Sequence, residues 1–327
     1  MRNSRIELLR IVSIIMIISM HILGYYKQFN ELTHFSLFMN SFCNTGVTLF
    51  ILISGFYGIK YIKWDKFFSL FNITTFYSIF ALLFIYDIAS LSKFDIIKNL
   101  FPVFCNKYWF VTSYLILMLL SGYIEKTLHN LTKKQMKLLI LYLCIFVIFS
   151  PSLFLLEIFN DSGKGFMNML TTYLIVRYIY IYGWPHHIAN HYKILIPTLT
   201  ILIWGLNEIL SLLNLQPYFC RDNNVLILIL ALSIFYWVIN MKPLMNYTLN
   251  QLSSYVFPIY IIHTIFLPII CKQLYNTQIP YIFQFIIGCI SLFFISIFID
   301  YLRILLFGKT LKRIESKQVE WVNNSIA

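Results

Sequence analysis

Apolar segments of about 20 residues, separated by short polar stretches, recur from one end of the chain to the other. An α-helix needs about 20 mainly apolar residues to cross the hydrocarbon core of a bilayer, so this pattern predicts membrane-spanning helices. The expected fold is all-α, a polytopic bundle of about ten transmembrane helices. These helices are predicted at residues 6–26, 36–58, 67–90, 108–126, 136–157, 166–184, 193–213, 223–241, 253–272 and 281–306.

The composition supports the same class of protein. Of the 327 residues, 59% are hydrophobic and 12% are charged, whereas a soluble domain has about 25% charged residues. The first apolar segment is too long for the core of a signal peptide, and no small-residue cleavage site follows it. We therefore expect it to be retained as a helix.

The distribution of charge predicts the orientation of the chain. A net charge of +12 is accounted for by Lys and Arg in cytoplasmic loops that face anionic lipid, so we expect a lipid bilayer and no nucleic acid as partner. With the N-terminus in the cytoplasm, the inner segments hold roughly twice as many cations as the outer ones, which favours both termini inside. Residues 1–306 form the predicted membrane domain, and 307–327 a short basic cytoplasmic tail.

Two polar residues of the first predicted helix are the main candidates for chemistry. Arg10 and His21 are eleven residues apart, so at about 100° per residue they share one helix face, separated by roughly 16 Å along the axis. Ionisable residues inside a membrane segment are costly and usually functional. A histidine can accept a proton from a hydroxyl, and an arginine can hold a phosphate or carboxylate.

Structural roles for both residues remain open. Arg10 lies three residues after Glu7 and could form a local ion pair with it while reaching toward the membrane surface. His21 could simply face the lipid headgroups. A shared helix face argues against both residues having only these structural roles.

Further polar residues lie in or next to the later apolar segments. Ser54 and Gly55 would permit close helix approach or a local break, and Lys60 and Lys63 follow at the cytoplasmic edge. Those two lysines are also explained by ordinary anchoring at the inner surface. Trp109, at the start of the fourth predicted helix, is typical of the aromatic belt at a membrane boundary.

Two residues inside later segments need partners. His263 is predicted near the bilayer centre, following Pro258, which we expect to loosen that helix and free backbone carbonyls. Arg177 is predicted to be buried and must bind either a substrate group or a protein group.

Histidines and cysteines elsewhere give weaker signals. In the cluster of His186, His187 and His191, the last two have helical i,i+4 spacing, but no carboxylate or cysteine accompanies them, so we expect interfacial residues and no metal site. Four cysteines are predicted near the outer face, where either disulfides or, more in keeping with their apolar setting, free thiols would fit. These four are Cys43, Cys105, Cys220 and Cys271.

The ordered set of motifs resembles the acyltransferase 3 family of bacterial integral-membrane acyltransferases. The stretch from Arg5 through Arg10 to Met20-His21 is similar to the first helix of that family, including its Arg-x10-His motif. Phe50–Gly55, Tyr108–Phe110 and Pro258–His263 resemble three later motifs in the expected order. Where the family often carries an Arg-x-x-Arg pair, this chain has Lys60 and Lys63, which keep the charge but lose the bidentate fork.

The resemblance implies a function in the bacterial cytoplasmic membrane. An acyl-CoA, most often acetyl-CoA, would donate an acyl group to a hydroxyl of a cell-surface carbohydrate or its lipid-linked precursor, with no bound cofactor. His21 would act as the base, with Arg10 positioning the donor or stabilising negative charge. Supporting roles are assigned in two groups: donor binding to Lys60, Lys63 and Ser54, and acceptor binding or support to Trp109, Tyr260, His263 and Arg177.

Other functions fit the sequence less well. A transporter or flippase for a lipid-linked sugar could use the same bundle, but it would not need Arg10 and His21 on one face, and no matched repeats are visible. A glycan polymerase or ligase would be expected to carry a large charged outer loop, which this chain lacks.

Overall fold

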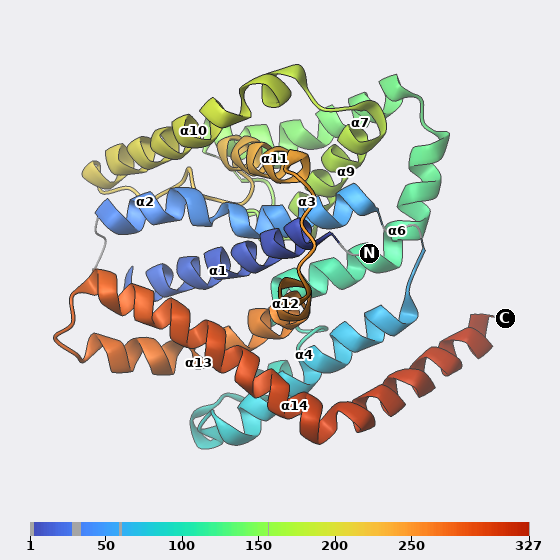
Figure 1. Ribbon diagram of the computed structural model, residues 1–327, viewed down its shortest axis with the longest axis vertical. Coiled ribbons are helices and arrows are strands. Elements are labelled where there is room, and N and C mark those ends of the chain that lie inside the picture. The colour runs from blue at the N-terminus through green and yellow to red at the C-terminus, as the bar shows by residue number, and fades with distance from the viewer. Residues whose placement is uncertain (1–2, 28–33, 59–60, 156, 327) are drawn as a thin grey trace.

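The computed structural model describes residues 3–27, 34–58, 61–155 and 157–326, and these residues form helices and connecting loops without a strand (Figure 1). The helices run α1 Ser4–Tyr26, α2 His34–Cys43, α3 Thr45–Tyr57, α4 Trp64–Phe84, α5 Lys93–Leu100, α6 Trp109–Asn130, α7 Lys133–Cys144, α8 Ser150–Phe154, α9 Phe166–Tyr182, α10 His186–Leu212, α11 Val225–Asn240, α12 Tyr247–Leu252, α13 Val256–Tyr275 and α14 Tyr281–Ile326. Short 3-10 turns at Ile88–Ser90 and Ser253–Tyr255 and a π-helical turn at Ile145–Phe149 join neighbouring helices.

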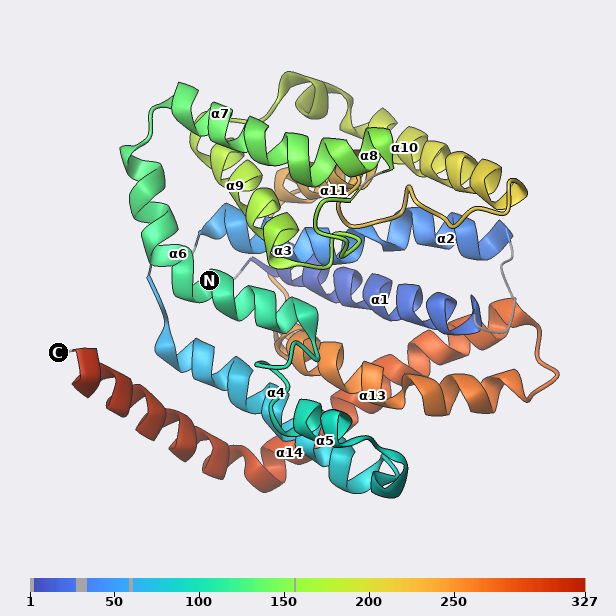
Figure 2. The same ribbon diagram turned by 180° about the vertical axis from the view of Figure 1, so that it is seen from behind.

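The first helix lies in the middle of the bundle. Figures 1 and 2 show α1 between the α2–α3 pair and α13, and it packs against α3, α13, α14 and α2. Most of the helix surface is buried against these neighbours, and Leu8, Val12 and Ile15 form one apolar strip that stays exposed. One core cluster joins α1 to α4, α6, α13 and α14, and a second joins it to α3, α9, α10 and α11.

Two glycines allow α3 to approach its neighbours closely. A Cβ at Gly46 would lie 2.8 Å from the backbone oxygen of Ser13 in α1, and one at Gly55 would clash with Val176 Cγ1 in α9. Small residues let membrane helices pack backbone to backbone. The expected close approach at Ser54-Gly55 is therefore confirmed.

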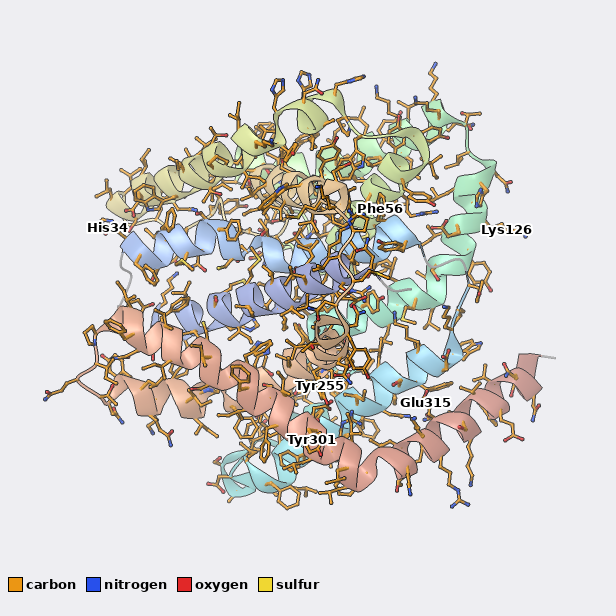
Figure 3. All side chains as sticks on the ribbon, viewed as in Figure 1. His34, Phe56, Lys126, Tyr255, Tyr301 and Glu315 are labelled. Carbon is orange, nitrogen blue, oxygen red and sulfur yellow. The ribbon has the colours of Figure 1, made fainter. Side chains whose placement is uncertain are left out.

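The all-α polytopic membrane fold predicted from the sequence is confirmed. Each of the ten predicted segments coincides with a helix or a run of consecutive helices, and seven helical stretches of the described chain are long and apolar enough to cross a membrane. Figure 3 labels His34 and Phe56 near opposite ends of the α2–α3 stretch, which extends across the bundle from one face to the other.

Some predicted boundaries are wrong. The segment expected at 67–90 ends as α4 at Phe84, and a 3-10 turn and α5 follow it. Pro258 lies in the first turn of α13, directly after the 3-10 turn Ser253–Tyr255 that separates α13 from α12 within the Tyr247–Tyr275 stretch. The proline inside this helix is Pro268.

The last helix continues through the basic tail. α14 reaches Ile326 without a break in helical structure, so 307–326 extends the membrane helix as an arm that leaves the bundle in Figures 1 and 2. Asn72 Nδ2 of α4 donates to Gln318 Oε1 at 2.7 Å and ties this arm to the bundle. Figure 3 labels Glu315 on the same arm. The start of α1 and the end of α14 lie toward the same side of the bundle, here called the terminal face (Figures 1 and 2); the other end of the bundle is the opposite face.

The close contact of α3 with α9 leads to a prediction about stability. Gly55→Ala should lower the melting temperature of the purified protein, because overpacking a close contact costs about 1–3 kcal/mol. Gly205→Ala is the matched control: nothing lies within 4 Å of a Cβ at that position in α10, so alanine should be neutral or stabilising by about 0.5–1 kcal/mol. Equal melting temperatures for the two variants would contradict the contact.

Candidate functional site

Two cavities open toward the terminal face. The first, the Arg10 cavity, has a volume of about 270 Å³ and is lined by Arg10, Ser54, Tyr114 and Tyr260 among others. The second, the Lys63 cavity, has a volume of about 260 Å³ and lies next to it, since both share Lys66 and Tyr114. The Lys63 cavity is also lined by two further tyrosines, Tyr57 and Tyr61. Together these cavities present cations and aromatic rings to one region of the molecule.

Arg10 forms the expected ion pair and also lines its cavity. Nη1 of Arg10 lies 3.3 and 3.2 Å from the two carboxylate oxygens of Glu7. The Glu7 side chain is 4% exposed, whereas that of Arg10 is 29% exposed. Glu7 therefore holds the arginine from the buried side, and the remaining guanidinium surface faces the cavity. Arg10 can therefore pair with Glu7 and still present part of its guanidinium to a ligand in the cavity.

A third cavity reaches the opposite face. This His21 cavity has a volume of about 450 Å³, and its polar lining includes His21, Lys27, Ser36, Asn40, Asn44 and Lys164. His21 and Arg10 thus line different cavities, although one continuous helix carries both. Polar cavities therefore open toward both faces of the bundle, two toward the terminal face and one toward the opposite face.

His21 is held by a second histidine. Its Nδ1 lies 2.7 Å from Nε2 of His263, and the two rings are nearly parallel, with centroids 5.0 Å apart. His263 is fully buried, and its own Nδ1 lies 2.8 Å from the backbone oxygen of Ile259. The partner that His263 needs inside the membrane is therefore His21, in addition to a backbone carbonyl.

These contacts fix which nitrogens carry protons. A carbonyl oxygen can only accept, so Nδ1 of His263 donates to Ile259. With both rings neutral, Nε2 of His263 is then an acceptor, and Nδ1 of His21 donates to it. Nε2 of His21 is left with a free lone pair. This is the arrangement in which a neighbouring group orients a histidine to act as a base.

Tyr260 connects the histidine pair to the Arg10 cavity. It lines that cavity, and its ring centroid lies 6.0 Å from that of His263, one helical turn further along α13. Ser54 lines the same cavity, and its hydroxyl lies 3.5 Å from that of Tyr114. The histidine pair therefore lies between the cavity on the terminal face and the one on the opposite face.

The predicted lysines are joined by one that the sequence pattern did not single out. Lys63 directly precedes α4, makes no side-chain capping bond there, and lines the Lys63 cavity. Lys60 lies outside the described residues. Lys66, one turn after Lys63, lines both cavities of the terminal face, and its i,i+3 spacing from Lys63 was the signal that could have identified it.

Arg177 and Trp109 line none of these three cavities. Arg177 is 4% exposed and pairs with Glu125, its Nη2 lying 2.7 Å from Oε2. Its Nη1 also reaches the backbone oxygens of Gly55 and Phe56 at 3.4 Å. The Arg177 side chain therefore ties α9 to α6 and to the end of α3.

Other predicted residues have structural partners. Trp109 is partly buried against the core and packs edge-on to Phe110. Arg303 and Asp300 form a local ion pair at 2.7 Å. All six cysteines are free thiols. Among the described residues, no three His, Cys, Asp or Glu side chains are grouped so that they could hold a metal ion.

Two loops that the sequence pattern did not single out lie at the opposite face, one between α8 and α9 and the other between α10 and α11. Arg221 forms an ion pair with Glu157 across them, and a Cβ at Gly163 would press against the backbone of Asp222 and Asn223. Asp222 is 6% exposed, and its Oδ1 has no hydrogen-bond partner in the described structure. Burial raises the pKa of Asp222 to about 7, against an opposing attraction from Lys164. These loops bring Lys164 to the His21 cavity.

The fold and these cavities define a polytopic α-helical membrane protein with its candidate chemistry inside the helix bundle. The family model described as an acyltransferase domain, that of acyltransferase family 3, matches residues 3–301. The chain therefore belongs to this family of membrane acyltransferases, which confirms the expected family. No curated protein and no solved structure matches the sequence.

The burial of Asp222 predicts a pH-dependent stability. Because the folded-state pKa is raised from 3.8 to about 7, the folded chain keeps a proton that the unfolded chain loses between pH 4 and 7. The contribution of this group to stability is therefore lost as the pH rises through that window. Asp222→Asn should stabilise the protein by a few kcal/mol at pH 8 and by much less at pH 5, since a tenfold difference in proton affinity corresponds to about 1.4 kcal/mol. Melting temperatures at the two pH values test this, and a pH-independent effect would contradict it.

Proposed function

We propose that this acyltransferase moves an acyl group, in the first instance acetyl, from acyl-CoA to a hydroxyl of a carbohydrate in the cytoplasmic membrane of a bacterium. The observation that carries the proposal is the position of the His21–His263 pair between the Arg10 cavity and the His21 cavity. Each substrate can approach the pair from its own side. The acceptor is a cell-surface polysaccharide or its lipid-linked precursor.

The donor enters from the terminal face. Acyl-CoA carries phosphates at one end and a thioester at the other, and Lys63, Lys66 and Arg10 follow one another along the two joined cavities. Lysine binds phosphate as a point charge and without the fork of arginine. Tyr57 and Tyr61 offer aromatic rings on which an adenine could stack. The thioester arm would then extend past Ser54 and Tyr260 toward the histidines.

The reaction is a direct transfer with His21 as the base. Nε2 of His21 takes the proton of the acceptor hydroxyl as the hydroxyl oxygen attacks the thioester carbonyl carbon. The resulting tetrahedral intermediate breaks its carbon–sulfur bond, and the proton on His21 passes to the leaving thiolate of CoA. The products are the ester and CoA, and both histidines return to their starting state.

The distance along α1 separates the roles of its two polar residues. Arg10 and His21 are roughly 16 Å apart along the helix axis, so a guanidinium at Arg10 does not reach the atoms that react at His21. Arg10 is therefore assigned to positioning the donor, and the role of stabilising charge on the reacting carbonyl is not given to it. His263 is a positioning residue, since it acts through His21.

Replacement of His21 should abolish acylation. His21→Ala removes the base, which is worth about 10²–10⁴-fold in rate. Mass spectrometry of surface glycans should show the loss of an ester-linked acyl mass both in cells carrying this variant and in cells lacking the gene. His129→Ala, at an exposed position in α6, is the control and should leave the mass unchanged. Loss or trapping of a whole glycan with unchanged acyl content per sugar would instead support a transporter.

The role of His263 predicts a difference between two substitutions. His263→Gln keeps an oxygen that can accept from Nδ1 of His21, whereas His263→Ala leaves His21 free to rotate and change its tautomer. We expect His263→Ala to lower kcat by about 10²-fold, with the KM for acyl-CoA little changed, and His263→Gln to recover a large part of this loss. Equal kcat values for the two variants in purified protein would exclude orientation of His21 as the role of His263.

A further inference from the structure

We propose that the acceptor carries a negatively charged group close to the hydroxyl that is acylated, and that Lys27 and Lys164 bind this group in the His21 cavity. The inference rests on the proposed function in that it takes this cavity as the acceptor site. The ligand class is an anionic sugar, with either a carboxylate or a phosphate as the charge.

The lining of the cavity is polar and cationic. Lys27 and Lys164 contribute two ammonium groups, and Ser36, Asn40 and Asn44 contribute hydrogen-bonding groups suited to sugar hydroxyls. Among the described residues that line the cavity, none is a carboxylate. A cavity of about 450 Å³ lies within the range of small-molecule sites.

The two lysines are not neutralised by the described protein groups. Lys27 donates to the side-chain oxygen of Gln216, which is uncharged, and neither lysine has a carboxylate within ion-pair distance in the described structure. Lys164 is exposed at the mouth of the cavity. Both ammonium groups thus remain available to an anion that enters.

The nearby acids have other roles. Glu157 pairs with Arg221 and accepts from the backbone N–H of Ser162. Asp161 accepts from the backbone N–H of Gly163 and closes that turn. Asp222 is buried and does not line the cavity, although it lies within electrostatic range of Lys164. The charge that a ligand meets in this cavity is therefore positive.

The position of Lys27 limits where the negative charge can be on the acceptor. His21 and Lys27 are six residues apart at the end of α1, which is about 9 Å along the axis. A group bound by Lys27 while a hydroxyl lies at His21 must therefore be on the same sugar or on its direct neighbour. A distant charge on a long polymer would not satisfy this geometry.

Equilibrium binding to the full-length protein in lipid nanodiscs tests the proposal. The probes are methyl β-glucoside, methyl β-glucuronide and glucose 6-phosphate, which share a sugar ring and differ in charge. We expect both anionic probes to bind about tenfold more tightly than the neutral one, the effect of one charge-assisted hydrogen bond. The anionic probe that binds more tightly shows whether carboxylate or phosphate is the preferred group. The preference for anionic over neutral probes should decrease as the salt concentration rises.

Three single substitutions locate the effect. Lys27→Gln and Lys164→Gln should each reduce the preference for the anionic probes by about five- to tenfold, with little change for the neutral sugar. Lys272→Gln is the matched control, because Lys272 is an exposed lysine near the end of α13 that does not line the cavity. Equal binding of charged and neutral probes, loss of preference in the control, or no binding of any probe would overturn the proposal.

A parallel measurement separates this proposal from the proposed function. Release of CoA from acetyl-CoA and formation of the sugar ester are followed in the same preparations. Selective binding that depends on the two lysines, without any ester formation, would support the anion site and contradict the acyl transfer. Ester formation at equal rates on charged and neutral sugars would support the transfer and contradict the anion site.

Discussion

Inside a membrane, a polar side chain must find its partner within the protein, and this constraint shapes the whole bundle. Arg177 meets Glu125, whose other oxygen accepts from Tyr173 at 2.7 Å. Asp300 likewise accepts from Tyr77 at 2.6 Å and from Arg303. Each cluster joins helices that are distant in sequence, so these buried contacts also determine which helices lie side by side.

The charged groups divide into those that are buried in ion pairs and those that line cavities. Arg177 and Arg303 are nearly enclosed by their partners, whereas Arg10, Lys63, Lys66, Lys27 and Lys164 line cavities. The His21–His263 pair combines both conditions, since one ring is bound on both nitrogens and the other keeps one nitrogen free. This distinction separates residues that hold the bundle together from residues that can meet a substrate.

The helices could be predicted because the length of an apolar segment is a local property of the sequence. Arg10 and His21 could be identified because both lie within one helix. It could not identify the partner of His21, which is 242 residues away. Glu125 was missed as the partner of Arg177 for the same reason, although the presence of these two opposite charges in apolar segments suggests that they pair. The loops around Lys164 and Asp222 carry no helical period, so their contribution to the His21 cavity depends on tertiary packing alone.

The central position of α1 has a mechanical consequence. This one helix carries Arg10 toward the terminal face, His21 at the histidine pair and Lys27 toward the opposite face. Its rise of 1.5 Å per residue fixes the separation between the Arg10 cavity and the His21 cavity. In the proposed reaction, this fixed distance along α1, rather than the movement of a domain, determines how far the donor arm must extend before its carbonyl meets the acceptor.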